Sequence, residues 1–135
     1  MKQLSYTLSA ERLQEGGRLA PYVIWSRLNA DGKDACGSYI SAMGLTFDEV
    51  WSIARRTCGE DRTFILPKMP ILEIIFRLLI VAPTDIVPAD RLHEMLSNAL
   101  TPSHNHISYD VMVRILSSAA SYGIVALQGE EDRRR

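Results

Sequence analysis

The sequence has few of the residues that mark the simplest functional classes. Its two cysteines, Cys36 and Cys58, are too few and too far apart for a disulfide scaffold or a CxxC redox motif, so we expect reduced thiols. The N-terminus lacks the apolar region of a secretory signal. The longest apolar run, residues 71–82, is interrupted by Glu73 and Arg77 and is shorter than the ~20 residues that span a bilayer. We therefore expect a cytoplasmic protein that does not enter the membrane.

The chain also has no large excess of positive or negative charge. The chain carries 15 Lys and Arg against 16 Asp and Glu, a formal net charge of −1. Residues 70–135, which look most like a DNA-binding module, hold 6 basic and 8 acidic side chains. Strong binding to nucleic acid rests on several cationic contacts to phosphate, so this balance argues against a nucleic-acid partner.

Motifs of catalysis and cofactor binding are also absent. The sequence has no GxSxG, GxGxxG or GxxxxGK[ST] pattern, and its eight glycines are scattered. His104 and His106 have ligand-like spacing, but no third ligand of matching spacing accompanies them, so a surface loop is the better interpretation. We predict no catalytic, cofactor-binding or metal-binding residue. A divergent enzyme would need an acid–base or nucleophile–base pair that we do not recognise.

What is present indicates one small globular domain. A chain of 135 residues with 47% hydrophobic side chains can bury a core without disulfides or metals. Residues 1–33 are predicted as an N-terminal extension of uncertain structure. Within it, residues 9–15 suggest a short helix stopped by two glycines, and the apolar run 22–28 suggests a strand or a helical turn.

Helix signals dominate from residue 45 onward. Thr46 and Glu49 form a capping box for a helix that should end near Cys58, with Gly59 at positive φ. Pro70 can open a helix over residues 71–81 that is apolar nearly all round. Such a helix must be covered on most sides, either by the core of the domain or by a partner subunit.

The remaining elements predict a winged-helix-like order. A helix from Pro88 to about Leu100 is followed by a helix capped by Ser108, which should run to Gly123 before a short strand at 124–127. The predicted fold is mainly α, a winged-helix-like domain over 34–127 with a short C-terminal β-strand, and a polar tail over 128–135. The second wing strand of such a fold is not found after the first, so we expect either that the hairpin pairs elsewhere or that the domain has been cut short.

A DNA-binding regulator is the alternative function for this order of elements. The predicted recognition helix offers Ser108, Tyr109 and Arg114, and the three C-terminal arginines could add positive charge. The helix carries one cation and one anion, and Glu130, Glu131 and Asp132 offset the arginines. A solvated or partner-packed face is therefore the favoured interpretation.

Several short motifs resemble the N-terminal domain of plant small-molecule O-methyltransferases of the caffeic acid and flavonoid type. They are DACGSYISAM (34–43), Leu-Pro (66–67), LEII (72–75), Pro83, Pro88 with Leu92 and Leu96, RIL (114–116) and ASY (120–122). The chain departs from the family pattern at Val87, Val113 and Ser118-Ala119. It also has no counterpart of the S-adenosylmethionine-binding domain with its glycine-rich loop and catalytic histidine.

The resemblance implies a dimerisation module without catalytic activity of its own. In that family this domain packs against the same domain of a second subunit, so we expect a homodimer, or a heterodimer with a related methyltransferase. The residues expected at the dimer interface are Leu72, Ile75, Phe76, Leu79, Ile115 and Tyr122.

Overall fold

The computed structural model describes residues 4–37, 44–103 and 106–128. Within these ranges the chain is mainly helical and has a small three-stranded sheet. The elements in chain order are β1 (Leu4–Leu8), α1 (Ala10–Glu15), α2 (Ala20–Trp25), α3 (Ala30–Cys36), α5 (Phe47–Cys58), α6 (Ile71–Val81), β2 (Val87–Pro88), α7 (Ala89–Leu100), a 3-10 turn (Thr101–Ser103), α8 (Tyr109–Leu116), a second 3-10 turn η2 (Ala120–Tyr122) and β3 (Ile124–Gln128). In the described part of the chain, no helix has both the length and the apolar character needed to cross a membrane.

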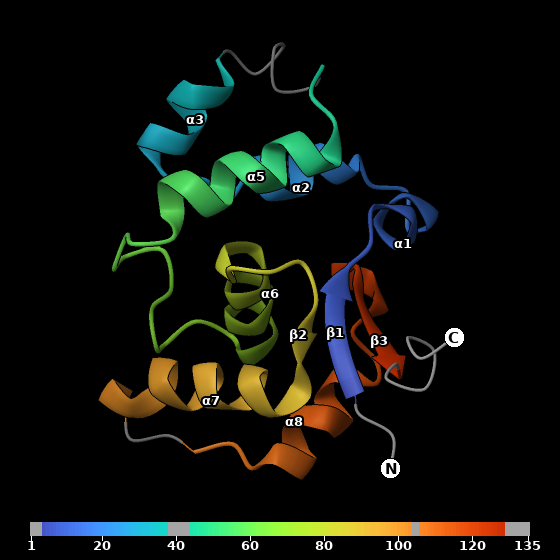
Figure 1. The fold of residues 1–135 in the computed structure, drawn as a ribbon, viewed down its shortest axis with the longest axis vertical. Helices are drawn as coiled ribbons and strands as arrows, with labels where there is room; N and C mark the ends of the chain where they lie inside the picture. Colours follow the sequence, from blue (N-terminus) through green and yellow to red (C-terminus); the bar gives the residue numbers. More distant parts are fainter. Residues whose placement is uncertain (1–3, 38–43, 104–105, 129–135) are drawn as a thin grey trace.

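The sheet has the order β2-β1-β3, and both pairs are antiparallel. β1 comes from the segment that we expected as an N-terminal extension, and it is the central strand. It pairs with β3 over five residues, from Leu4 opposite Gln128 to Leu8 opposite Ile124. The N-terminal end of β1 and the C-terminal end of β3 therefore lie side by side at the same end of the sheet (Figure 1).

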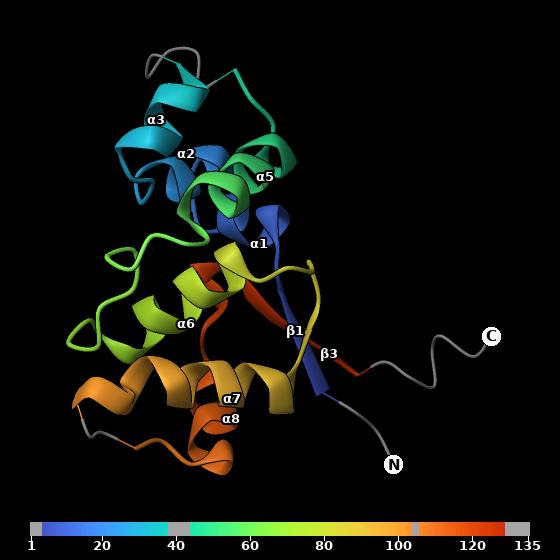
Figure 2. The ribbon, with the colours of Figure 1, turned by 60° about the vertical axis from the view of Figure 1, so that its left-hand side comes forward.

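Helix α6 occupies the middle of the molecule. Figure 1 shows it between α5 on one side and α7 on the other, and Figure 2 shows the same order after rotation. The indole Nε1 of Trp51 in α5 donates to the carbonyl oxygen of Ile80 at 2.9 Å, which joins the two helices. The buried side chains of α6 are Ile74, Ile75, Phe76, Leu78, Leu79 and Ile80. The apolar surface of this helix is thus covered by the chain itself.

Local signals in the sequence correctly place most helix starts. The Thr46 hydroxyl accepts from the Glu49 amide at 3.1 Å and the Glu49 carboxylate accepts from the Thr46 amide at 2.8 Å, which confirms the capping box. The Ser108 hydroxyl caps α8 by accepting from the Val111 amide. Gly59 follows α5 as expected, but its φ is −61°, so the prediction of positive φ there is wrong.

The last predicted helix is shorter than its pattern suggested. α8 ends at Leu116, where the Ser117 hydroxyl donates to the carbonyl oxygen of Arg114 at 2.6 Å. Serine hydroxyls compete for backbone carbonyls and so favour helix ends. The chain then makes the 3-10 turn η2 and reaches Gly123, whose φ of +73° allows the turn into β3.

Candidate interaction sites

The side chains expected at a dimer interface lie mostly inside the single chain. Ile75 and Phe76 are fully buried and Leu79 is 1% exposed, because α5 and α7 pack on opposite sides of α6. The structure places these three side chains in the core of the single chain. The others, which are half-buried, are Leu72, Ile115 and Tyr122.

The outer face of α8 has little of the charge that a DNA-reading helix needs. Its exposed side chains include Tyr109, Asp110 and Arg114, followed by Ser117. One cation and one anion on this face cancel, so it offers no cluster of contacts to phosphate.

The histidines do not form a metal site in the part of the chain that is described. His93 Nε2 lies 2.7 Å from the carbonyl oxygen of Ile107, and the His93 ring meets the Tyr109 ring edge-to-face. His104 lies outside the described residues. Among those that are described, no group of three or more His, Cys, Asp or Glu residues is placed to hold a metal ion.

Strand β3 forms one edge of the sheet. Its five residues, Ile124 to Gln128, contain no charged residue and no proline. The Ser9 amide donates to the carbonyl oxygen of Gly123 at 2.7 Å, which continues the β1–β3 ladder. Hydrogen-bonded pairs alternate in an antiparallel ladder, so the backbone groups of Ile124, Ala126 and Gln128 point away from β1. Within the described ranges no strand pairs with this outer edge.

A second candidate site is a hollow of about 480 Å³ beside α2. Two apolar side chains at its rim are unusually open to solvent, since Leu19 is 57% and Tyr22 is 39% exposed. The Tyr22 ring stacks on Trp25 with 5.6 Å between ring centroids, and the ammonium of Lys33 lies 4.9 Å from the Trp25 ring. The full lining is Gly17, Arg18, Leu19, Tyr22, Val23, Ser26 and Arg27.

Arg27 connects this hollow to a half-buried ion triad. Its Nε and one terminal nitrogen donate to the two carboxylate oxygens of Glu73 at 2.8 and 3.0 Å. Arg77, one turn further along α6, donates to the same carboxylate at 2.7 Å and also to the carbonyl oxygen of Phe64 at 2.8 Å. The side chains are 15% exposed for Glu73 and 19% for each arginine. The triad therefore ties α2, α6 and the segment before α6 together.

The electrostatics of the triad favour the ionised carboxylate. Burial raises the pKa of Glu73, but the hydrogen bonds and positive charges of Arg27 and Arg77 together outweigh it, so the pKa lies below its ordinary value. Two guanidinium groups share one carboxylate, which leaves one positive charge uncompensated within the triad.

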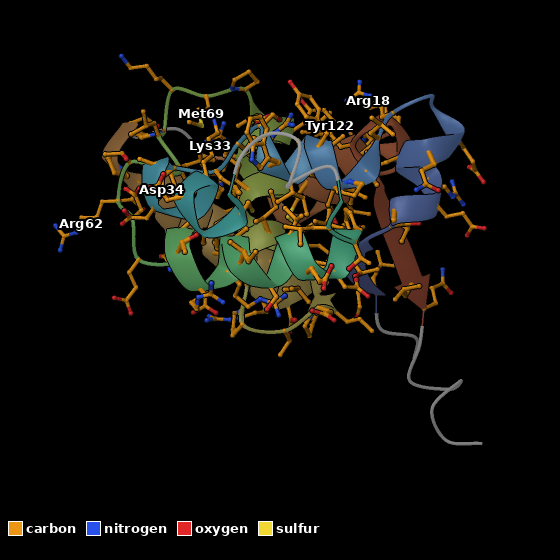
Figure 3. The ribbon with its side chains drawn as sticks, turned by 90° about the horizontal axis from the view of Figure 1, so that it is seen from above. Arg18, Lys33, Asp34, Arg62, Met69 and Tyr122 are labelled. Atoms are coloured by element: carbon orange, nitrogen blue, oxygen red, sulfur yellow. The ribbon has the colours of Figure 1, made fainter. Side chains whose placement is uncertain are left out.

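The Phe76 ring links the triad to the far end of the chain. The guanidinium carbon of Arg27 lies 4.7 Å from the centroid of this ring, and the Tyr122 ring meets it edge-to-face at 5.5 Å. In Figure 3, Tyr122 and Arg18 lie on the same side of the molecule, the side on which α2 is seen. Tyr122 and Arg27 therefore contact the same ring of the core.

Two polar hollows next to α5 consist of paired groups. In the smaller one, of about 220 Å³, Arg55 donates to Asp85 at 2.9 Å and its guanidinium lies 5.4 Å from the Trp51 ring. In the other, Asn29 donates to Asp61 at 2.7 Å. Hydrogen bonds from Asn29 and from Thr63 lower the pKa of Asp61. Arg55 lines both hollows, and its Nε is buried without a hydrogen-bond partner among the described residues.

Cys36 and Cys58 are buried free thiols. Burial raises the pKa of Cys36, an effect that Arg56 partly offsets, so its thiol is not activated as a nucleophile.

Comparison of the chain with protein-family models, with curated proteins and with solved structures finds no match. Identification of a function therefore depends on the geometry of the sites described above.

Proposed function

We propose that α6, β2, α7, α8 and β3, together with β1, form a winged-helix-like unit that serves protein dimerisation. The order helix, strand, helix, helix, strand supports this proposal. A winged helix needs a further strand beside its last one, and here β1 lies in that place between β2 and β3. In this proposal β1 takes the part of the second wing strand.

The uncharged outer edge of β3 is the observation that carries dimerisation. Edge strands of monomeric proteins are commonly protected by charges, prolines or bulges, and β3 has neither charge nor proline and pairs in unbroken register with β1. An antiparallel edge can pair with its own copy, because an isologous interface needs only a self-complementary surface. Two copies related by a two-fold axis at Ala126 would extend the sheet from three strands to six.

The resemblance to O-methyltransferase N-terminal domains is in keeping with dimerisation, since those domains pair with their own copies. The interface proposed here differs from the one expected in that family, because the chain itself covers most of α6. The route that remains open among the described elements is backbone pairing at the edge of the sheet.

The test is the mass in solution by light scattering behind a sizing column, over a concentration series. Wild type should be a dimer that dissociates on dilution. Ala126→Pro removes an outward amide without breaking the β1–β3 ladder, and it should raise the dissociation constant by about tenfold or more, since two backbone hydrogen bonds are lost per dimer. Ala126→Thr keeps the amide and suits a strand, so it should remain dimeric.

A monomer at every concentration would overturn the dimerisation proposal. A wild-type dimer that survives Ala126→Pro would show that β3 is not the interface. Binding of duplex DNA is the second candidate, and it is disfavoured by the charge of α8. Binding of duplex DNA at low salt, measured by fluorescence anisotropy and weakened steeply by added salt, would favour DNA binding over dimerisation.

A further inference from the structure

The hollow beside α2 combines open apolar surface with positive charge, and it is independent of the β3 edge. We propose that this hollow binds small carboxylic acids that carry an apolar group. The apolar part would lie against Leu19 and Tyr22, and the carboxylate would lie between Arg18 and Arg27. Its volume of about 480 Å³ falls in the range of small-molecule sites.

The charge of the lining selects the sign of the ligand. Two of the seven lining residues are arginines and none is acidic. Arg27 already binds Glu73, but Glu73 also neutralises Arg77, so the triad next to the hollow keeps one positive charge in excess. Within the described ranges, no carboxylate other than that of Glu73 contacts Arg27 or Arg77. Charges removed from water are stabilised when they are paired, so an anion would compensate this excess.

The geometry of the arginines suits a carboxylate. The guanidinium of Arg27 is held on three sides, by Glu73, by the carbonyl oxygen of Val23 at 2.8 Å and by the Phe76 ring. It is therefore ordered before a ligand arrives, which lowers the entropic cost of binding. Arg18 is exposed and can adjust to the ligand, and a Cβ at the neighbouring Gly17 would meet no atom within 4 Å, so the entrance is open.

The apolar side chains at the rim favour a ligand that carries an apolar group as well as a negative charge. Leu19 is the N-cap residue of α2 and is more than half exposed, and Tyr22 lies one turn later on the same side. Covering both by an apolar group would remove their surface from water, which favours binding. A small inorganic anion would leave this surface open and should bind much more weakly.

The proposal is tested with three probes that differ only in the head group: 3-phenylpropionate, 3-phenylpropanol and 3-phenylpropylamine. Each is titrated into the full chain and followed by backbone amide shifts in two-dimensional NMR. The acid should shift the amides of residues 17–27 and bind about tenfold more tightly than the alcohol, because a charge-assisted hydrogen bond replaces a neutral one. The amine should bind more weakly than the alcohol.

Two variants separate the charge from the apolar contact. Arg18→Gln should reduce the preference for the acid over the alcohol, because only Arg27 then faces the carboxylate, and it should leave the alcohol unchanged. Leu19→Ala should weaken both. Arg62→Gln, at an exposed arginine on a different part of the surface (Figure 3), is the matched control and should change neither. Equal binding of acid and alcohol, shifts confined to other elements, or no shifts at all would overturn the proposal. None of these results depends on whether the chain dimerises.

Discussion

Replacing Glu73 with glutamine removes the charge that two arginine side chains share. The amide can still accept from one guanidinium, but it cannot balance either positive charge. The donors that lose their ionic partner are those of Arg27, at 2.8 and 3.0 Å, and that of Arg77, at 2.7 Å. The triad joins three parts of the fold. We therefore expect the loss of the Glu73 charge to lower the free energy of unfolding of the whole chain.

The burial of the groups sets the magnitude. Breaking a fully buried ion pair by removing one partner costs about 3–5 kcal/mol, whereas exposed pairs contribute about 0–1 kcal/mol. Side-chain exposures of 15% for Glu73 and 19% for the arginines place this triad nearer the buried case. We therefore expect Glu73→Gln to lower the free energy of unfolding by about 2–3 kcal/mol at neutral pH.

The effect should depend on pH with a definite sign. The folded-state pKa of Glu73 is depressed below its unfolded value, so its contribution to stability is fully present above the unfolded pKa of about 4.3. That contribution is lost as the pH falls through the folded-state pKa. The difference in stability between wild type and Glu73→Gln should therefore shrink in acid and stay constant from pH 6 to pH 8.

Urea unfolding followed by circular dichroism measures the difference directly. Glu94→Gln is the matched control, because Glu94 pairs with Arg91 at 2.9 Å on the surface, with the two side chains 63% and 54% exposed. It should change stability by less than about 0.5 kcal/mol. If Glu73→Gln costs no more than Glu94→Gln, or if its cost does not fall in acid, the triad does not hold the helices together as argued.

Two further substitutions test the backbone and the core. Gly123→Ala should cost more than Gly17→Ala in thermal unfolding, by about 1–3 kcal/mol, because both have positive φ but only at Gly123 would the new Cβ lie 2.7 Å from Leu13; equal costs would contradict the clash. Trp51→Phe removes the donor to the Ile80 carbonyl oxygen and should lower the free energy of unfolding by about 1–3 kcal/mol in urea, and a change below 0.5 kcal/mol would show that water replaces the bond.

Local chemistry explains why many element boundaries are readable from the sequence. A hydroxyl such as that of Ser108 caps α8 through an atom three residues away, and Gly123 supplies a φ that other residues avoid. Such signals need no knowledge of the rest of the chain. These signals fail where a local side-chain hydrogen bond competes with the helix. At Ser117 the hydroxyl bonds to a backbone carbonyl oxygen, and α8 ends earlier than its pattern predicts.

Residues 4–8 show what local sequence signals cannot predict. LSYTL has the alternating pattern of many short strands, and nothing in it specifies that its partners are residues 87–88 and 124–128. Pairing over such separations is decided by how the helices between the strands pack. The central strand of the sheet was therefore not predictable from the sequence.

The apolar character of residues 71–81 illustrates why hydrophobicity alone does not locate an interface. Burial of apolar surface is favourable whichever molecule provides the cover, so the same sequence pattern suits a central helix and a dimer face. In this structure α5 and α7 provide the cover for α6. The two surfaces proposed here for partners depend on relations between distant residues. One is the outer edge of β3, with which no strand of the described ranges pairs, and the other is the positive charge that Glu73 of α6 does not balance beside the hollow at α2. Both depend on tertiary structure, so a search for function in chains of this kind should begin from unpaired backbone edges and unbalanced half-buried charges.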